Sequence, residues 1–321
     1  MHRSGTSAFA GSLAKAGLFA GKSFDLLPAA NDNPHGFFER FDVTDFNNEL
    51  LAELGGAWDN PPSRLAVIEH APLWQDRAEE ILETMAKEAD GRPLVIKDPR
   101  MCLLLPVWLT AFGDRFTLVL VDRNPLEVAA SMHQREGRPL HVGLALWQLY
   151  CAELLEGLAG KKVWFARYES LLLSPTQHTS ALLDELKGSL AVGADGTRAV
   201  GGINGVSDAA AFVVGELRHQ RIESTGADLE QALTEDQFAL RRWLCQLPEG
   251  WVTLDAPSNF CSQPKEALAF AVERDARLGK PAPAPTLRGA LRLARHHYHE
   301  GGLIQVTKRG ASEVLRLACK R

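Results

Sequence analysis

The sequence of 321 residues lacks any run of about 18 consecutive apolar residues, the length that a membrane-spanning helix requires. Its five cysteines are far apart, and they form neither a CxxC pair nor a Cys/His cluster of the kind that binds zinc. Reduced thiols in a cytoplasm are the simplest interpretation, so we expect a cytoplasmic protein. The net charge of −5 argues against a general nucleic-acid binder, because such proteins carry excess positive charge.

What the sequence does contain is an alternation of predicted strands and helices. Short apolar runs predict buried strands over residues 94–96, 116–121 and 162–166. Helical spacing and start signals, with Thr44 and Asn124 as expected helix caps, predict helices over residues 8–19, 42–54, 73–89, 103–112, 126–135, 140–157, 175–187, 207–220 and 234–247. The alternation predicts an α/β fold, a P-loop-like three-layer arrangement in which a parallel sheet is flanked by helices, followed by a helical C-terminal part.

Composition divides the chain into two regions. We expect one domain over residues 1–280, with a cofactor-binding core over residues 1–187, and a glycine-rich segment at 188–205 that is a surface linker rather than a lid. Three prolines between Pro281 and Pro285 indicate a hinge. Residues 281–321 form a basic helical tail, with eight lysines and arginines against two glutamates. We expect this tail to be solvated, with contact to an anionic membrane or partner as the alternative.

The first seven residues carry an anion-binding signal. Ser4, Gly5, Thr6 and Ser7 are small, and they precede an apolar segment with helical spacing. Backbone N–H groups at the start of a helix attract anions, and Arg3 adds a charged fork suited to phosphate or sulfate oxygens. The alternative is an ordinary helix cap. The loop is not a Walker A motif, because no Gly-Lys-Ser/Thr follows a four-residue spacer.

Polar side chains follow the predicted strands at their carboxyl ends. Lys97 follows the first strand, Arg123 the second and Tyr168 the third, and Arg3 lies in the N-terminal loop. Right-handed crossovers place the carboxyl ends of parallel strands at one edge of a sheet, where ligands of open α/β sheets bind. We therefore expect these four side chains to converge.

The N-terminal segment His-Arg-Ser-Gly-Thr-Ser resembles the 5′-phosphosulfate loop of sulfotransferases, in the Arg-Ser-Gly-Thr form of the tyrosylprotein and bacterial carbohydrate members. In that family the loop follows a buried parallel strand, whereas here only Met1 precedes it. We therefore expect a first strand to be missing from the sequence, and the genomic sequence upstream to encode about 4–8 mostly apolar residues in frame.

Three later segments extend the resemblance over residues 1–187. The stretch from Arg123 to Ser131 is similar to the family's 3′-phosphate segment, and Arg135, one turn further along the same helix, is a further expected phosphate ligand. Lys97, in a Lys-Asp-Pro segment, matches the lysine that approaches the bridging oxygen of the donor. Tyr168, in an Arg-Tyr-Glu segment, matches the tyrosine that contacts the nucleotide.

The resemblance implies sulfuryl transfer from 3′-phosphoadenosine 5′-phosphosulfate (PAPS) to an acceptor hydroxyl, with 3′-phosphoadenosine 5′-phosphate (PAP) as product and no metal required. Positive charge must be fixed where negative charge develops, and Arg3, the loop amides and Lys97 would supply it. Glu39 is the first choice for the base, because its aromatic neighbours would desolvate it, and His35 is the second. The expected acceptor is a carbohydrate, with a tyrosine or a lipid as alternatives.

Two other functions stay open at this point. A P-loop kinase of a small metabolite would use ATP, and Asp98 and Asp122 lie at strand ends where a metal-binding acid would be needed. A catalytically silent nucleotide-binding module would keep the fold and lose the base. A requirement for a 3′-phosphate without magnesium favours the sulfotransferase over the kinase, and transfer to an acceptor separates it from the silent module.

Overall fold

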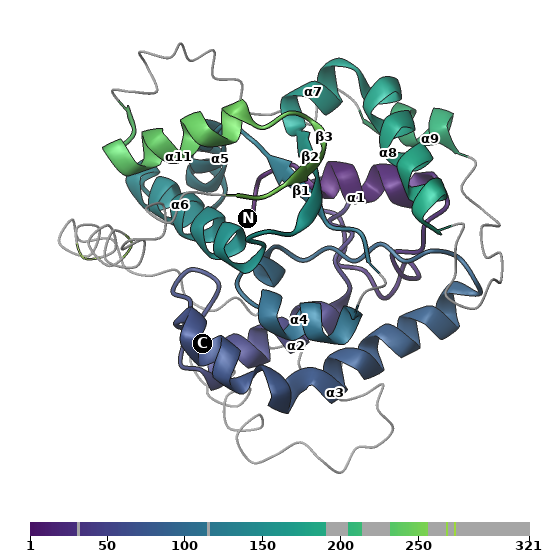
Figure 1. Cartoon of the computed structure of the whole chain (residues 1–321), viewed down its shortest axis with the longest axis horizontal. Helices are drawn as coiled ribbons and strands as arrows, with labels where there is room; N and C mark the ends of the chain where they lie inside the picture. The colour runs from purple at the N-terminus through teal and green to yellow at the C-terminus, as the bar shows by residue number, and fades with distance from the viewer. Residues whose placement is uncertain are drawn as a thin grey trace, which may run out of the picture. The chain divides into compact units, whose positions relative to one another are not determined.

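A computed structural model describes residues 1–30, 33–113, 116–190, 205–213 and 232–255, together with Leu268 and Glu273 (Figure 1). These residues belong to the first of two compact units, Met1–Asp275, and the second unit is Ala276–Arg321. The described elements are α1 (Thr6–Lys15), α2 (Phe41–Glu53), α3 (Arg64–Ala89), η1 (Pro99–Cys102), α4 (Leu105–Phe112), β1 (Val119–Asp122), α5 (Pro125–Glu136), α6 (Leu140–Gly157), β2 (Lys162–Arg167), α7 (Tyr168–Leu173), α8 (Pro175–Leu190), α9 (Val206–Phe212), α11 (Glu235–Gln246) and β3 (Gly250–Thr253).

The fold is a mixed α/β structure, mostly helical, around a small sheet. Its three described strands lie in the order β1-β2-β3. β1 pairs with β2 in parallel, with Val119 opposite Trp164, and β3 pairs with β2 in antiparallel, with Val252 opposite Val163. The antiparallel strand β3 is absent from the sequence-based prediction. In Figure 1 helices α5, α6 and α11 lie on one side of the sheet, and α1, α8 and α9 lie on the other.

Alternate residues of the strands face two different apolar cores, as the two-residue period of a strand requires. On β2, Val163 and Phe165 belong to the larger core, which α2, α3, α4 and α6 complete. The neighbouring residues Trp164 and Ala166 pack into a second core with α1, α8 and α9. The sheet is therefore covered by helices on both faces, which is the coarse α/β arrangement that the alternation of elements predicts.

One helix start lies far from its prediction, and one predicted cap residue is wrong. α3 begins at Arg64 rather than at 73, because Ser63 caps it by accepting a hydrogen bond from the Ala66 N–H at 3.1 Å. The helix continues through Pro72, and apolar side chains are buried on both sides of that residue. The Thr44 cap is wrong: Arg40 is the cap residue of α2, and the Thr44 hydroxyl donates to Asp98 instead. The Asn124 cap is confirmed, since its side chain accepts from the Leu126 N–H at 3.0 Å.

The predicted strand over residues 94–96 is only an isolated bridge. Leu94 pairs in parallel with Phe19, held by hydrogen bonds from the Phe19 N–H to the Pro93 carbonyl (2.8 Å) and from the Val95 N–H to the Phe19 carbonyl (2.9 Å). Phe19 therefore lies in extended backbone, so α1 ends at Lys15 and not at residue 19. The strand predicted from 116 begins at Val119, where its register with β2 begins.

Several predictions concern residues outside the described ranges. These are most of the glycine-rich segment 188–205, the end of the helix predicted to residue 220, the hinge between Pro281 and Pro285, and the basic tail 281–321. Among the described cysteines, Cys102, Cys151 and Cys245 are free thiols. No helix in the described part of the chain is long and apolar enough to cross a membrane.

Candidate functional site

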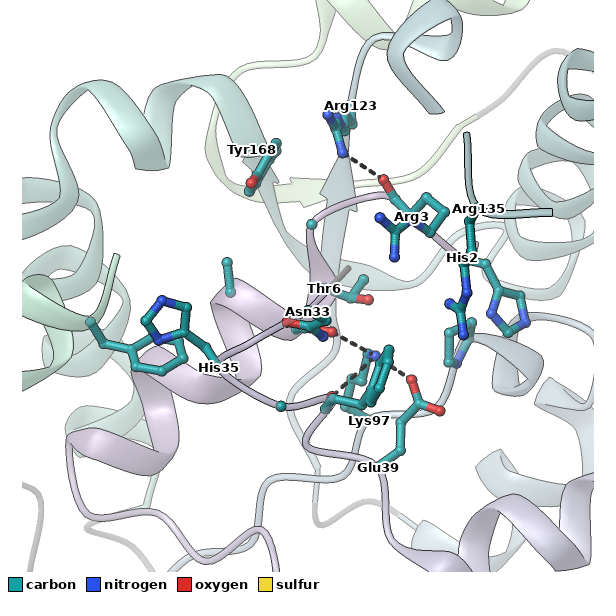
Figure 2. Close-up of a pocket in the computed structure, with 17 residues that line it drawn as sticks. His2, Arg3, Thr6, Asn33, His35, Glu39, Lys97, Arg123, Arg135 and Tyr168 are labelled. Carbon is teal, nitrogen blue, oxygen red and sulfur yellow. Dashed lines mark hydrogen bonds and ion pairs between the residues drawn. The ribbon is translucent and has the colours of Figure 1, made fainter. Parts of the chain in front are cut away.

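One pocket brings together side chains from segments that are far apart in the sequence (Figure 2). It contains about 680 Å³ of space not filled by atoms, open solvent included. Its described lining residues carry four fixed cations and a single carboxylate. They are His2, Arg3, Gly5, Thr6, Ser7, Ala8, Asn33, His35, Gly36, Phe37, Glu39, Lys97, Pro99, Arg123, Arg135, Tyr168 and Phe212.

The N-terminal loop enters α1 through two left-handed residues. Arg3 has φ 64° and Gly5, the cap residue of α1, has φ 82°. Glycine suits this backbone because it has no Cβ, whereas Arg3 adopts it at a cost of about 1–2 kcal/mol. The cap residue Gly5 has no side chain, so it supplies no capping oxygen to this positive helix end. The turn through Gly5 places Thr6 and Ser7 in the pocket wall.

The Tyr168 ring packs directly on this turn. A Cβ atom built on Gly5 would lie only 2.2 Å from the ring, so a side chain at this position would overlap Tyr168. The Arg123 guanidinium also contacts the ring, and it lies 4.8 Å from the ring centroid, within cation–π range. Tyr168 is the first residue of α7, directly after β2, so the end of this strand fixes its position beside the loop.

Arg123 and Arg3 connect the loop to α5. Arg123 follows β1 and donates from Nη1 to the Arg3 carbonyl oxygen at 2.8 Å. It also forms an ion pair with Glu127 one turn along α5 (Nη2 to Oε2, 3.1 Å), and the Glu127 side chain is fully buried. Arg3 donates from Nε to Ser131 Oγ at 2.8 Å. These contacts fix two guanidinium groups at the wall of the pocket.

Lys97 and Glu39 form the second polar centre of the pocket, and Figure 2 shows their side chains pointing toward each other. The Lys97 ammonium group lies 2.5 Å from Glu39 Oε1, and both side chains are largely buried. The same ammonium donates to Ser7 Oγ at 3.1 Å and to the Phe37 carbonyl oxygen at 3.3 Å. The pocket carboxylate is therefore already in contact with a pocket cation.

A buried support lies next to this pair. Arg100 Nη1 lies 3.9 Å from Glu39 Oε2 and forms an ion pair with Asp98 at 2.8 Å. Asp98 Oδ2 also accepts from the Thr44 hydroxyl at 3.0 Å, and Asp98 Oδ1 accepts from the Arg100 backbone N–H at 2.7 Å. Burial acts to lower the pKa of Arg100, but Asp98 and Glu39 outweigh it and raise the pKa above its usual value. Arg100 is thus a permanent cation.

Aromatic rings form the remaining wall. The Arg135 guanidinium lies 5.5 Å from the centroid of the Phe37 ring. Phe212, from α9, is in edge contact with His35 (5.3 Å between centroids) and with Phe38 (5.5 Å). The rings of Phe37 and Phe38 thus contact Arg135 and Phe212, and the Glu39 carboxylate contacts Lys97 and Arg100. Glu39 is buried, and the prediction that its aromatic neighbours Phe37 and Phe38 desolvate it stays a prediction.

His2 lies beside the cationic side of the pocket. Its ring packs against Trp58 (4.7 Å between centroids) and Tyr150 (6.2 Å), and its Nε2 atom is buried with no hydrogen-bond partner in the described structure. Burial, followed by the positive charge of Arg100, lowers the pKa of His2 well below 6.5. The imidazole is therefore neutral at neutral pH.

The structure brings together most of the residues predicted for the site. Arg3, Gly5, Thr6, Ser7, His35, Glu39, Lys97, Arg123, Arg135 and Tyr168 all line the pocket. Two predicted ligands, Ser4 and Ser131, are buried and do not line it, and the Ser131 hydroxyl is instead a partner of Arg3. His2, Asn33 and Phe212 were not predicted from the sequence. His2 adjoins Arg3 and could have been selected, whereas no local signal marks Phe212.

Comparisons of the chain with models of protein families, with curated proteins and with solved structures found no match. Similarity therefore assigns no family to the protein. The resemblance to sulfotransferases stays a prediction from four short segments, and the function must be inferred from the chemistry of the pocket.

Proposed function

We propose that this protein is a sulfotransferase that moves a sulfuryl group from PAPS to an acceptor hydroxyl. The observation that carries the proposal is the convergence of Arg3, Lys97, Arg123 and Arg135 on one pocket at the start of α1. The four residues come from three separate segments of the chain, since Arg123 and Arg135 both belong to the region of α5. A doubly phosphorylated, sulfonated nucleotide is strongly anionic, so fixed cations and an uncapped helix start suit it.

Each cation has a different role in this proposal. Arg3 and the first turn of α1 would bind the 5′-phosphosulfate, since they occupy the loop that enters the helix. Arg123 and Arg135, at the two ends of α5, would bind the 3′-phosphate. Lys97 would stabilise the charge that develops on the oxygen between phosphorus and sulfur. The Tyr168 ring offers a flat apolar surface beside Arg123 for the nucleotide.

Glu39 would act as the base in an in-line displacement. The acceptor oxygen forms a bond to sulfur while the bond from sulfur to the bridging oxygen breaks, and that bond's electron pair stays on the 5′-phosphate of PAP. The acceptor proton goes to the carboxylate of Glu39, which lines the pocket. His35 stays the alternative base, because it lies in the same wall next to Phe212.

A kinase would need an acidic side chain to hold magnesium, and the two candidate aspartates are both paired with arginines. Asp98 forms an ion pair with Arg100 at 2.8 Å, and Asp122 forms one with Arg241 at 2.6 Å. Neither aspartate lines the pocket. A carboxylate committed to a buried arginine would first have to lose that partner before it could hold a magnesium ion. These contacts disfavour a kinase, and the response to Mg-ATP below tests that alternative directly.

The experiment measures the thermal stability of the protein with 3′,5′-ADP, 5′-ADP and Mg-ATP at matched concentrations. A ligand at 100 times its Kd stabilises the folded state by about 2.7 kcal/mol, which is readily measured. We expect stabilisation by 3′,5′-ADP without magnesium, and loss of the effect in Arg135→Gln. Arg77→Gln is the matched control, since Arg77 also lies over a phenylalanine ring, at 5.2 Å from Phe46, but outside the pocket.

Other outcomes separate the alternatives. Stabilisation by Mg-ATP alone would replace the proposal with the kinase. Binding of 3′,5′-ADP without transfer of labelled sulfuryl groups from PAPS to any of a panel of sugars, phenols and lipids would favour the silent module. No response to any of the three nucleotides would refute nucleotide binding at this pocket.

A further inference from the structure

The contacts of Lys97 use its full hydrogen-bonding capacity. An ammonium group has three N–H donors. Lys97 Nζ donates to three oxygens: Ser7 Oγ at 3.1 Å, the Phe37 carbonyl at 3.3 Å and Glu39 Oε1 at 2.5 Å. An incoming oxygen can therefore bind this ammonium group only by displacing one of the three.

Glu39 is the partner that an anion would displace. Ser7 and the Phe37 carbonyl are neutral, so they hold Lys97 in place without competing for its charge. The Glu39 carboxylate has the same sign as a sulfonate, and the two would repel each other if both approached Lys97. The Glu39 side chain is only 7% exposed, so solvent and salt screen this competition weakly.

Arg100 makes the displacement of Glu39 feasible. A buried carboxylate that loses its partner cation is strongly destabilised. Arg100 Nη1 lies 3.9 Å from Glu39 Oε2, and Asp98 holds Arg100 in place through an ion pair of 2.8 Å. A cation therefore remains beside Glu39 after Lys97 has turned to another anion.

We infer that Glu39 and the donor's 5′-phosphosulfate exchange at Lys97, so that binding of the donor releases the base. This inference rests on the proposed function. Before the donor binds, Oε1 of Glu39 accepts a hydrogen bond from Lys97, and the exchange would free this oxygen to face the acceptor hydroxyl. The exchange makes donor binding precede proton transfer, and Arg100 is the positioning residue that orients Glu39 afterwards.

The test compares the affinities of PAPS, which carries the 5′-phosphosulfate, and adenosine 3′-phosphate, which lacks any 5′ group, by calorimetry on the full chain without acceptor. Glu39→Gln removes the competing charge, so we expect the ratio of the adenosine 3′-phosphate Kd to the PAPS Kd to rise about tenfold or more. Lys97→Met should reduce the preference for PAPS. The double variant should behave like Lys97→Met, because the effect of Glu39 acts through Lys97.

Glu88→Gln is the matched control, since Glu88 also forms an ion pair, 2.7 Å from Arg40, but lies outside the pocket. It should leave the ratio unchanged. An unchanged ratio in Glu39→Gln would overturn the exchange. So would an increase that persists in the Lys97→Met background, because it would show simple repulsion between Glu39 and the donor. If the wild-type protein bound neither nucleotide, the proposed function would fall, and the exchange with it.

The positioning role of Arg100 has its own readout, the release of sulfate from PAPS with water as the acceptor. Arg100→Met should slow this release while the Kd of PAP stays unchanged, and Arg100→Lys should restore the rate, because it restores a cation beside Glu39. Loss of PAP affinity in Arg100→Met, or failure of Arg100→Lys to restore the rate, would show a merely structural role and overturn the assignment.

Discussion

Substitution of Gly5 by alanine tests the close packing between the N-terminal loop and the Tyr168 ring. Two costs add at this position. Gly5 has φ 82°, and an alanine in this left-handed region costs about 1–2 kcal/mol. The new Cβ would also lie 2.2 Å from the buried ring, and overpacking of this kind costs about 1–3 kcal/mol. Alanine restricts the unfolded chain, which returns about 0.4–1 kcal/mol.

We therefore expect Gly5→Ala to lower the free energy of unfolding by about 2–4 kcal/mol, measured by urea denaturation. Gly55→Ala is the matched control, because Gly55 has a similar φ of 72° but no heavy atom within 4 Å of the position that an alanine Cβ would take. It isolates the backbone cost, about 1 kcal/mol.

The excess cost of Gly5→Ala over the control measures the contact with Tyr168. Combining Gly5→Ala with Tyr168→Ala should remove that excess, since the two substitutions act on one contact and are not additive. Equal costs for Gly5→Ala and Gly55→Ala, or full additivity in the double variant, would refute the packing of Tyr168 on Gly5. Gly5→Ala should also weaken binding of 3′,5′-ADP, because it displaces the turn that presents Thr6 and Ser7 to the pocket.

Three further predictions concern ionisable side chains. Glu39→Gln should lower the turnover of sulfuryl transfer about 100-fold while 3′,5′-ADP still binds, and near-normal turnover would remove Glu39 from the role of base. Arg123→Lys keeps the charge but loses the fork that joins Glu127 to the Arg3 carbonyl, so 3′,5′-ADP should bind about tenfold more weakly; unchanged affinity would contradict this. The lowered pKa of His2 means that the unfolded chain binds a proton more readily there, so stability should fall as the pH drops from 7 to 5. His2→Phe keeps a ring against Trp58 and should reduce this fall in urea denaturation, whereas an identical fall would show that His2 does not contribute.

The sequence predicts which side chains gather at the site better than it predicts which of them contact one another. Lys97, Arg123 and Tyr168 could be placed together because each follows an apolar run, and the ends of such runs meet in a sheet. The prediction held for Lys97 even though its run forms a bridge and not a strand. Pairing of Lys97 with Glu39 could not be predicted, because 58 residues separate them and many partners satisfy a lysine.

The place of Phe212 in the pocket and the passage of α3 through Pro72 could not be predicted from local sequence. Phe212 reaches the pocket because Gly11 of α1 leaves room for its ring, and a Cβ on Gly11 would lie 2.3 Å from it. Such complementarity between two helices has no signature in either segment alone. Similarly, α3 passes through Pro72 because buried side chains before and after it hold the helix together, which overrides the local preference of proline.

The hydrogen bonds that tie the N-terminal loop to α5 have a consequence for how the protein folds. They join residues 120 and 128 positions apart, between Arg3 and Arg123 and between Arg3 and Ser131. Contacts of such long range form only after the intervening chain has been ordered, whereas helices form early. During synthesis the loop can form these hydrogen bonds only after more than a hundred further residues have been added to the chain. Recovery of nucleotide binding should accordingly be among the last events of refolding, after helical circular dichroism has returned.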